Sequence, residues 1–426
     1  MAQFGDVVQE FASRGLIHDS TDRADLTKRS TTSQMSAYVG FDPTSDSLHV
    51  GNLLGQISLR RFQMLGHRPV VLAGGATGMV GDPSGRSEER NLLDADTLAH
   101  NVSCIKGQLE RILDFDSGAN KAVLVDNATW TKDIPVLDFL RDVGKYITVN
   151  QMMAKDSVKS RISDGTGLSF TEFSYMLLQA NDFRHLCEHL DCEMQMGGSD
   201  QWGNITTGTE LIRRKESGKA YALTCPLITK ADGTKFGKSE SGNIWLDPEK
   251  TSPYEFYQFW LNASDADAEN YIKIFTFRPK AEIEALVSKH QEEPHLRLLQ
   301  KALTEDITIA VHGEEALRTA IAASNILFGK STSDDLKALS ERDFFAVFSG
   351  VPQATISKEE FQSIGILDAL AGKTGFLSSN SEVRRELKAG AISVNKEKVG
   401  EEFAFSDEHL INGKYVLLGK GKKNNY

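Results

Sequence analysis

A histidine and an asparagine stand three residues apart where a strand is expected to give way to a helix. His49 and Asn52 belong to FDPTSDSLHVGN at 41–52, which follows the apolar run SAYVGF. Side chains at i and i+3 lie on one side of a first helical turn, and the positive end of a helix attracts anions. The segment therefore suits the phosphates of a nucleotide. The alternative is a glycine-containing turn with an incidental histidine.

Two lysines, Lys235 and Lys238, lie in the glycine-bearing segment ADGTKFGKSESG at 231–242. A phosphate-binding P-loop needs four residues between its glycines, whereas three separate Gly233 from Gly237, so that motif is excluded. A short loop with two lysines can still close over a polyphosphate. A solvated basic turn is the alternative.

A third glycine-rich segment, AGGATGMVGDPSGRSEER, follows a predicted strand at 73–90. It lacks the first glycine of a dinucleotide fingerprint, and the Gly-Asp-Pro run at 81–83 interrupts the helix that would follow, so we exclude a nicotinamide site. Asp82, Arg86 and Arg90 remain candidate ligands, with a plain surface turn as the alternative.

A polar stripe runs along the helix predicted for FTEFSYMLLQANDFRHL. Tyr175, Gln179 and Asp182 lie at i, i+4 and i+7 and share one face. The rest of this helix is largely apolar, so it is buried, and a buried carboxylate is costly unless something binds it. The stripe predicts a pocket for a polar ligand. An internally satisfied polar network is the alternative.

Paired glycines end a predicted strand in QMGGSDQWGNITTG at 195–208, and Asp200 and Gln201 follow them. In an open α/β sheet, ligands bind at the carboxyl ends of the strands. This segment is therefore a further candidate for ligand contact, with a glycine-rich turn as the alternative.

The elements that must position these residues alternate between strands and helices. SAYVGF, RPVVLAGG and KAVLVDN read as strands, and GNLLGQISLRRFQMLGH between the first two reads as a helix. Strand, helix and strand at this spacing predict a parallel α/β sheet. Residues 250–330 read as helical.

Basic side chains lie in the last part of the chain. Arg384, Arg385 and Lys388 share the helical stretch SEVRRELK, which a glycine turn and a short strand follow. A basic helix face of this kind suits contact with the phosphates of folded RNA. A solvated charged helix is the alternative.

Composition limits the classes of protein that remain. The chain has 426 residues, 40% of them hydrophobic, and a net charge of −11, as in an ordinary soluble globular protein of two or three domains. No apolar run reaches the roughly 18 residues of a membrane span. Asp6 and Glu10 stand where an export signal needs apolar residues, so we expect a cytoplasmic protein. The four cysteines fit no disulfide scaffold or zinc pattern, and no protein metal site is predicted.

The charge is unevenly distributed. The acidic excess argues against a general nucleic-acid binder, because such a protein needs a basic surface. Residues 381–426, however, hold 9 Lys and Arg against 7 Asp and Glu. A local basic site for RNA in this last segment therefore remains compatible with the overall charge.

Taken in order, these segments resemble the tyrosyl-tRNA synthetases of the bacterial and organellar type, which are class I aminoacyl-tRNA synthetases. LHVGN is similar to the HIGH signature of that family and KFGKS to its KMSKS signature, while GDPSGR and GGSDQWGN are more specific to it. Asn52 replaces the second histidine of HIGH, Val39 stands where some relatives have a polar contact to the ribose, and Arg86 stands where some have lysine.

The resemblance implies roles for individual residues. Tyr38 and Asp182 would bind the phenol, Asp82, Tyr175 and Gln179 the α-ammonium group, and Gln201 would lie near the carboxylate. The ATP-binding residues would be Gly40, Asp42, Gly51, Gly198, Asp200 and Lys238. The residues acting on the phosphates would be Thr44, His49, Asn52, Lys235, Lys238, Ser239, Arg86 and Arg90.

The resemblance also implies a reaction and a domain order. L-Tyrosine and ATP, with Mg²⁺ accompanying the ATP, would give tyrosyl-adenylate, and the tyrosyl group would then pass to tRNA(Tyr). The order would be a Rossmann-like parallel-sheet catalytic domain with a dimer-forming insertion (1–245), an α-helical anticodon-side domain (246–335), a linker (336–360) and a small α+β RNA-binding domain (361–426). The protein would be a homodimer.

Three alternatives stay open at this point. A tryptophanyl-tRNA synthetase shares the fold and both signatures, although the Tyr38–Asp182 pair is not expected there. An RNA-binding paralogue without aminoacylation activity would have no need of the phosphate ligands. A plain nucleotidyltransferase would have no need of the C-terminal basic segment.

Overall fold

The computed structural model describes residues 4–84, 93–163, 165, 167–234, 236–239, 242–328, 332–348, 352–421 and 424–425. The chain divides into two compact units. The first comprises residues 1–250 and 259–311, and the second comprises 251–258 and 312–426. Within the described ranges, every helix is too short or too polar to cross a membrane.

A six-stranded sheet forms the centre of the first unit, in the order β1-β6-β5-β2-β3-β4. Its strands pair in parallel except for β1, which is antiparallel to β6. The α/β prediction is confirmed, and the predicted strands are present. The strands are β1 (Asp19–Ser20), β2 (Ser36–Phe41), β3 (Arg68–Ala73), β4 (Val123–Asp126), β5 (Cys192–Gly198) and β6 (Tyr221–Cys225).

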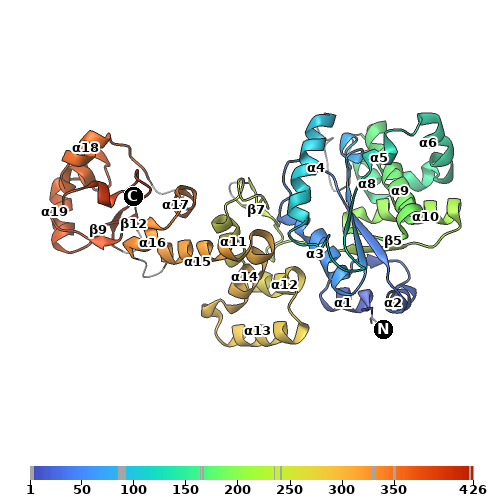
Figure 1. Cartoon of the computed structure of the whole chain (residues 1–426), viewed down its shortest axis with the longest axis horizontal. Helices are drawn as coiled ribbons and strands as arrows, with labels where there is room; N and C mark the ends of the chain where they lie inside the picture. Colours follow the sequence, from blue (N-terminus) through green and yellow to red (C-terminus); the bar gives the residue numbers. More distant parts are fainter. Residues whose placement is uncertain are drawn as a thin grey trace. The chain divides into compact units, whose positions relative to one another are not determined.

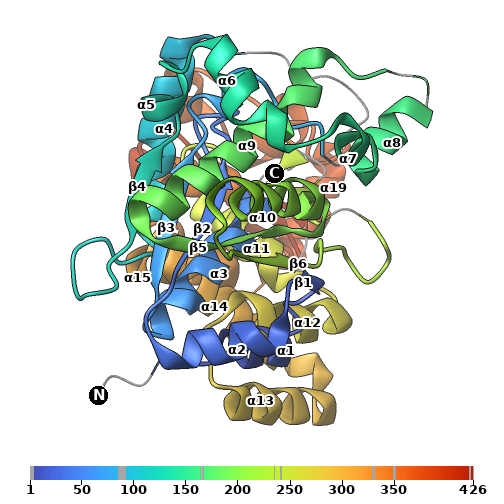
Figure 2. The ribbon, with the colours of Figure 1, turned by 90° about the vertical axis from the view of Figure 1, so that its right-hand side faces the viewer.

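Helices cover both faces of this sheet. Figure 1 shows α3 and α4 on one side of the strands and α9 and α10 on the other, and Figure 2 shows α9 and α10 crossing in front of β5 and β2. The helices of this region are α1 (Val7–Ser13), α2 (Arg23–Thr32), α3 (Val50–Met64), α4 (Ala95–Leu109), α5 (Ala128–Thr131), α6 (Val136–Asp142), α7 (Val149–Met153), α8 (Asp156–Ser163), α9 (Phe170–Leu190) and α10 (Trp202–Glu216).

The connections explain where a ligand can enter. The chain leaves β2 through α3 to β3 on one side, and later returns through α9 to β5 on the other side of β2. The direction in which the chain adds strands to the sheet therefore reverses between β2 and β5. Loops diverge at such a point and leave a crevice at the carboxyl ends of the strands.

Local sequence sets the ends of the two helices that flank this crevice. His49 caps α3, because its ring nitrogen Nδ1 accepts a hydrogen bond from Gly51 N and Asn52 Oδ1 accepts one from His49 N. Ser169 caps α9 by accepting from Glu172 N, and Asp191 ends that helix in the left-handed conformation. Caps of this kind satisfy N–H groups that have no partner inside the helix.

Residues after the sheet are mostly helical, as predicted, and a hairpin precedes them. β7 (Lys238–Ser239) pairs with β8 (Gly242–Asn243). The following helices are α11 (Pro253–Leu261), α12 (Asp265–Phe275), α13 (Lys280–Glu292), α14 (Leu298–His312), α15 (Glu314–Phe328), α16 (Ser333–Lys337) and α17 (Glu341–Val347).

The C-terminal part of the second unit contains a small antiparallel sheet in the order β10-β9-β11-β12. Ile411 and Leu417 pack with Leu336 and Phe344 in one buried cluster, so this part shares a core with α16 and α17. Its elements are α18 (Lys358–Ser363), α19 (Asn380–Lys388), β9 (Ile392–Val394), β10 (Glu397–Lys398), β11 (Leu418–Lys420) and β12 (Asn424–Asn425).

Candidate active site

A cleft of about 880 Å³ opens where the winding of the sheet reverses. Fourteen of the residues predicted from the sequence line this one cleft, although they come from four separate segments of the chain. They are Tyr38, Gly40, Asp42, Thr44, His49, Gly51, Asn52, Asp82, Tyr175, Gln179, Asp182, Gly198, Asp200 and Gln201.

Five further residues predicted to act on the phosphates have side chains that lie outside the described part of the structure. Arg86, Arg90 and Lys235 lie outside the described residues. Lys238 and Ser239 form β7, of which the backbone is described. The roles of these five residues stay predictions.

Asp182 lies at the buried end of the cleft, and two side chains from the segment after β4 hold it. Asn127 Nδ2 donates to Asp182 Oδ2 at 2.9 Å, and Trp130 Nε1 donates to Asp182 Oδ1 at 2.8 Å. Both carboxylate oxygens thus accept a hydrogen bond from the protein. Each oxygen retains a further lone pair for a ligand hydroxyl.

Burial dominates the electrostatics of this end. It raises the pKa of Asp182 to about 7, against the opposing effect of the two hydrogen bonds, and the charges of Asp42 and Asp126 raise it further. Burial likewise raises the pKa of the Tyr38 phenol. A phenolic ligand would therefore meet a neutral Tyr38 hydroxyl and a carboxyl that titrates near neutral pH.

Three buried polar atoms on the cleft wall have no hydrogen-bond partner among the described residues. They are Tyr38 Oη, Gln179 Oε1 and Gln195 Oε1. Buried polar groups are rarely left unpaired, because an unmade hydrogen bond costs about 1–3 kcal/mol. Their convergence on one cleft indicates that a polar ligand or water completes the site.

A second carboxylate, Asp82, is held at the carboxyl side of β3. Gln201 Nε2 donates to Asp82 Oδ2 at 2.6 Å, and Asn204 Nδ2 donates to Asp82 Oδ1 at 3.3 Å. Gln179 Nε2 in turn donates to Gln201 Oε1 at 3.3 Å. Gln201, expected from the sequence to be a direct ligand, also orients Asp82.

A third carboxylate, Asp42, is connected by hydrogen bonds to the Asp182 end of the cleft. Tyr175 Oη donates to Asp42 Oδ2 and Thr77 Oγ1 donates to Asp42 Oδ1, each at 2.8 Å. Asn127 Nδ2 also donates to Thr77 Oγ1 at 3.0 Å. Because Asn127 contacts both Thr77 and Asp182, one hydrogen-bonded network spans the cleft from Tyr175 to Trp130.

The first turn of α3 differs from the sequence-based expectation in one respect. Its backbone N–H groups are already engaged: Val50 N donates to Ile244 O, and Gly51 N to His49 Nδ1. A phosphate would therefore be held by side chains and the helix dipole rather than by these amides. Because Nδ1 accepts a hydrogen bond, Nε2 is the protonated nitrogen of a neutral His49.

Sequence reasoning missed several residues that hold the carboxylates. Thr77, Asn127, Trp130 and Asn204 were not singled out, although each donates a hydrogen bond to a site carboxylate. Asn127 carried a usable signal, because a polar residue directly after a buried parallel strand lies at the ligand edge. Trp130 carried no such signal, since the sequence does not show toward which element the short helix α5 directs its side chain.

Comparison with known proteins identifies this arrangement. Residues 30–329 match the family described as tRNA synthetases class I (W and Y), and residues 343–426 match the Tyrosine--tRNA ligase SYY-like C-terminal domain. The Tyrosine--tRNA ligase of Flavobacterium johnsoniae is 58% identical over 426 residues, covering 98% of each chain. The chain belongs to the tyrosine–tRNA ligases.

Other relatives agree with this assignment. The Tyrosine--tRNA ligase of Bacteroides fragilis strain YCH46 is 57% identical over 98% of each chain. A C-terminally truncated mitochondrial tyrosyl-tRNA synthetase from Aspergillus nidulans matches with a TM-score of 0.68 and 32% identity, covering 74% of this chain and 92% of that chain. The predicted family, ligase activity and class I fold are confirmed, and the tryptophan enzyme, the inactive paralogue and the nucleotidyltransferase are set aside.

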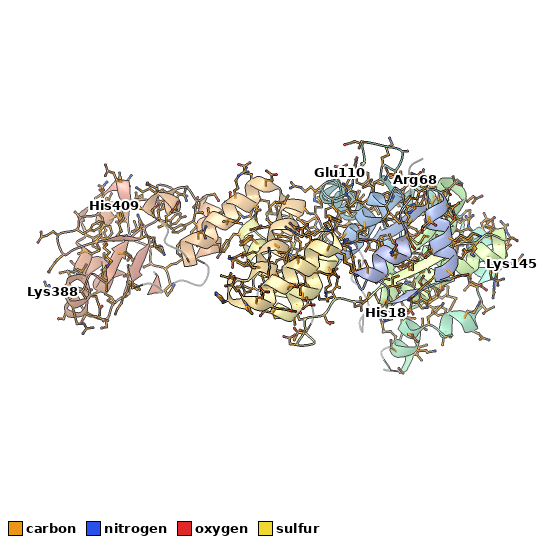
Figure 3. The ribbon with its side chains drawn as sticks, turned by 90° about the horizontal axis from the view of Figure 1, so that it is seen from below. His18, Arg68, Glu110, Lys145, Lys388 and His409 are labelled. Carbon is orange, nitrogen blue, oxygen red and sulfur yellow. The ribbon has the colours of Figure 1, made fainter. Side chains whose placement is uncertain are left out.

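The side chains predicted to bind RNA lie in the second unit of the ligase, on α19. Arg384, Arg385 and Lys388 are all exposed there, and Figure 3 labels Lys388 at the outer edge of the ribbon. Arg384 pairs with Glu401 at 2.9 Å and Arg385 with Glu386 at 3.2 Å. Exposed pairs of this kind are weak and leave both arginines able to exchange partners.

Proposed function

We propose that the cleft carries out both steps of the ligase reaction, with the roles assigned to its residues from the sequence. L-Tyrosine would enter ring first, so that its phenol lies between Tyr38 and Asp182. The observation that carries this assignment is the unpartnered Tyr38 hydroxyl at the buried end that holds Asp182. A phenol can accept from Tyr38 and donate to Asp182, whereas a phenylalanine ring would leave the Tyr38 hydroxyl unpaired and add no hydrogen bond to Asp182.

The other groups of tyrosine have matching partners along the cleft. Asp82, Tyr175 and Gln179 would hold the α-ammonium group, and Gln201 would lie beside the carboxylate. Asp82 is buried with its two oxygens held in place by Gln201 and Asn204. A fixed carboxylate is a strong, charge-assisted partner for an ammonium group.

Activation needs no nucleophilic side chain, because the carboxylate of tyrosine is itself the nucleophile. Its oxygen forms a bond to the α-phosphorus of ATP, and the bond from that phosphorus to the pyrophosphate oxygen breaks. Catalysis then consists of positioning the two substrates and stabilising the charge that grows on the phosphates. Thr44, His49 and Asn52 would act at the phosphates from the described part of the cleft, together with Arg86, Arg90, Lys235, Lys238 and Ser239.

Nucleotide contacts would come from the turns that follow β2 and β5. Gly40, Asp42 and Gly51 lie on the first side, and Gly198 and Asp200 on the second. A Cβ at Gly198 would come within 2.5 Å of Asp200 Oδ1, so glycine allows this carboxylate to fold back over the strand end. Burial raises the pKa of Asp200, and a ribose hydroxyl donating to it would favour its charged form.

Magnesium would arrive with ATP rather than reside in the protein. Mg²⁺ keeps several waters and binds substrate phosphates through few protein ligands. No group of three His, Cys, Asp or Glu side chains in the described part of the chain could enclose a metal ion. The ion would neutralise charge on the phosphates.

The decisive experiment is tyrosine-dependent exchange of pyrophosphate into ATP. We expect exchange with tyrosine and not with phenylalanine or tryptophan, and loss of both activity and tyrosine selectivity in Asp182→Ala. Asp116→Ala is the control, because Asp116 is an exposed carboxylate in the loop after α4. Normal selectivity in Asp182→Ala would refute the phenol assignment.

The enzyme is also proposed to act as a homodimer through the insertion between β4 and β5. One side of this insertion is buried, with Val143, Ile147 and Met152 packed in a cluster with α9. Seven other apolar side chains of this region are exposed: Val136, Leu137, Leu140, Val149, Met153, Ile162 and, at the start of α9, Phe170. Leu137 and Phe170 are 75% and 76% exposed, and apolar surface of this kind is characteristic of protein interfaces.

Binding of tRNA(Tyr) is proposed to involve α19. Replacing Arg384, Arg385 and Lys388 together with alanine should raise the KM for tRNA and leave pyrophosphate exchange unchanged. Each lost phosphate contact should reduce the slope of log affinity against log salt by about 1. An unchanged salt slope would show that α19 is only a solvated helix.

A cytoplasmic location stays a prediction of the same proposal. All four cysteines, Cys104, Cys187, Cys192 and Cys225, are unpaired, which suits a reducing compartment. Cell fractionation with an antibody against the chain would test it.

A further inference from the structure

The hydroxyl of Ser47 occupies a junction between the two segments that carry the phosphate-binding signatures. Ser47 is 4% exposed. Its Oγ donates to Leu48 O at 2.7 Å, and accepts from Asp247 N at 3.1 Å and from Gln108 Nε2 at 3.0 Å. A hydroxyl has one donor and two acceptor positions, and all three are used here.

The side-chain amide of Gln108 completes the junction from α4. While Nε2 donates to Ser47 Oγ, Oε1 accepts from Leu48 N at 2.9 Å. One amide therefore binds two successive residues, and the next residue along the chain is His49. Gln108 lies in the last turn of α4, just before Glu110, which Figure 3 labels.

α4 holds the start of the same loop as well as its end. Asn101 is 4% exposed, and its Nδ2 donates to Pro43 O at 2.8 Å. Asn101 and Gln108 are seven residues apart, and so lie on one face of the helix. The loop from 43 to 48, which contains Thr44 and precedes His49, is thus fastened to α4 at both ends.

The opposite side of this junction is the segment that leaves the Lys238 hairpin. Leu246 N donates to Leu48 O at 2.8 Å, and Val50 N donates to Ile244 O at 2.9 Å, so residues 48–50 and 244–246 pair as short antiparallel strands. Ile244 N donates to Gly237 O at 3.1 Å. Ser47 contacts both partners of this pairing, because it bonds Leu48 O and Asp247 N.

Outside the buried junction, a charged contact connects the same two segments. Lys250 Nζ lies 2.6 Å from Asp46 Oδ1 and sits over the Trp245 ring at 5.3 Å. This pair lowers the pKa of Asp46. The two segments are therefore held at Asp46, Ser47 and Leu48 in succession, and the next residue in line is His49.

We propose that Ser47 and Gln108 are positioning residues for the activation step, which set the register between the His49 segment and the segment leaving the Lys238 hairpin. Ser47, which lines the cleft, and Gln108, which is not among its lining residues, do so by hydrogen bonding to the backbone and to each other. The inference rests on the proposed roles of His49 and Lys238 at the phosphates. A displacement of about 1 Å in such a site lowers a rate by about a hundredfold, so the register of these two segments controls the rate of adenylate formation.

The test compares Ser47→Ala and Gln108→Ala with wild type in single-turnover kinetics. We expect the rate constant of tyrosyl-adenylate formation at saturating tyrosine and ATP to fall by about tenfold to a hundredfold. The Kd for tyrosine, and the rate of transfer from preformed adenylate to tRNA, should stay within twofold. The double variant should lose about as much as the more impaired single variant, because both changes break one hydrogen-bonded unit.

Two further variants keep the test independent of folding. Gln108→Glu retains the acceptor for Leu48 N and loses only the donor to Ser47, so it should recover part of the lost rate. Lys106→Ala, which changes an exposed residue of the same helix paired with Glu110, should match wild type.

Two outcomes would overturn the proposal. An unchanged rate of activation in Gln108→Ala and Ser47→Ala would show that the junction does not position the activation step. Equal losses in tyrosine binding, activation and transfer would indicate local unfolding instead of lost register. If wild type itself showed no tyrosine-dependent exchange, the proposed function would fail first, and that result is separate from the effect of the variants.

Discussion

The indole nitrogen of Trp130 donates a 2.8 Å hydrogen bond to Oδ1 of Asp182, and this contact connects α5 to the buried end of the cleft. The Trp130 ring also stacks on the His185 ring, with the two centroids 4.3 Å apart. His185 in turn stacks on His189, with centroids 4.1 Å apart. The orientation of the Asp182 carboxylate, for which we propose phenol binding, is thus fixed by residues that sequence motifs do not mark.

Trp130→Phe should weaken tyrosine binding. The substitution keeps most of the aromatic stack but removes one of the two donors that stabilise the charged carboxylate of Asp182. A hydrogen bond to a charged group contributes about 1.5–3 kcal/mol, so we expect the Kd for tyrosine, measured by equilibrium dialysis, to rise about tenfold to a hundredfold. His189→Ala, which removes the outermost ring of the stack, should leave the Kd unchanged.

The titration of Asp182 should be visible in the stability of the ligand-free enzyme. Burial raises its pKa in the folded state to about 7 from 3.8, so the folded protein binds a proton that the unfolded chain releases. The stabilising contribution is complete below pH 4 and is lost as the pH rises through 7. Between pH 5 and 8, the free energy of unfolding of wild type relative to Asp182→Asn should therefore fall by up to about 3 kcal/mol. A difference independent of pH in urea titrations would contradict this assignment.

Tyrosine affinity should depend on the same group with the opposite sign. The phenol donates a stronger hydrogen bond to a charged carboxylate than to a neutral carboxyl, so the Kd for tyrosine should rise by up to about tenfold as the pH falls from 8 to 6. Asp182→Asn should bind weakly and without this pH dependence. Equal pH profiles for the two proteins would place the titrating group elsewhere.

Gly74 should not tolerate a side chain, because it packs against the network at Asp42. A Cβ there would lie 2.1 Å from Asp42 Oδ1 and 2.5 Å from Thr77 Oγ1. We expect Gly74→Ala to displace Asp42, to destabilise the fold by about 1–3 kcal/mol and to slow pyrophosphate exchange. Gly107→Ala is the matched control: its Cβ meets no atom within 4 Å, and alanine in a helix should add up to about 1 kcal/mol of stability.

The exposed apolar side of the insertion should control oligomeric state. Leu137→Asp combined with Phe170→Asp should convert a dimer to a monomer in analytical ultracentrifugation, because charges cannot be buried unpaired at an interface. Phe345→Asp, at a residue of the second unit that is 38% exposed, should leave the mass unchanged. A monomeric wild type would refute the proposed dimer.

The sequence by itself determined the family, the parallel sheet and fourteen of the residues that line the cleft. Apolar strands separated by an amphipathic helix favour parallel pairing, and polar residues that follow parallel strands gather at one edge of the sheet. This is why Asp82 and Asp200 could be selected at the ends of strands from distant segments, while the family resemblance added Asp42 to the same site.

Only the tertiary structure decided how the carboxylates are held and what supports the signatures. The contacts of Trp130 with Asp182 and of Gln108 with Ser47 join residues 52 and 61 positions apart. No periodicity in the sequence encodes such contacts, because they depend on the packing of whole elements against the sheet. The tertiary structure also decided that the first backbone amides of α3 donate to Ile244 O and His49 Nδ1.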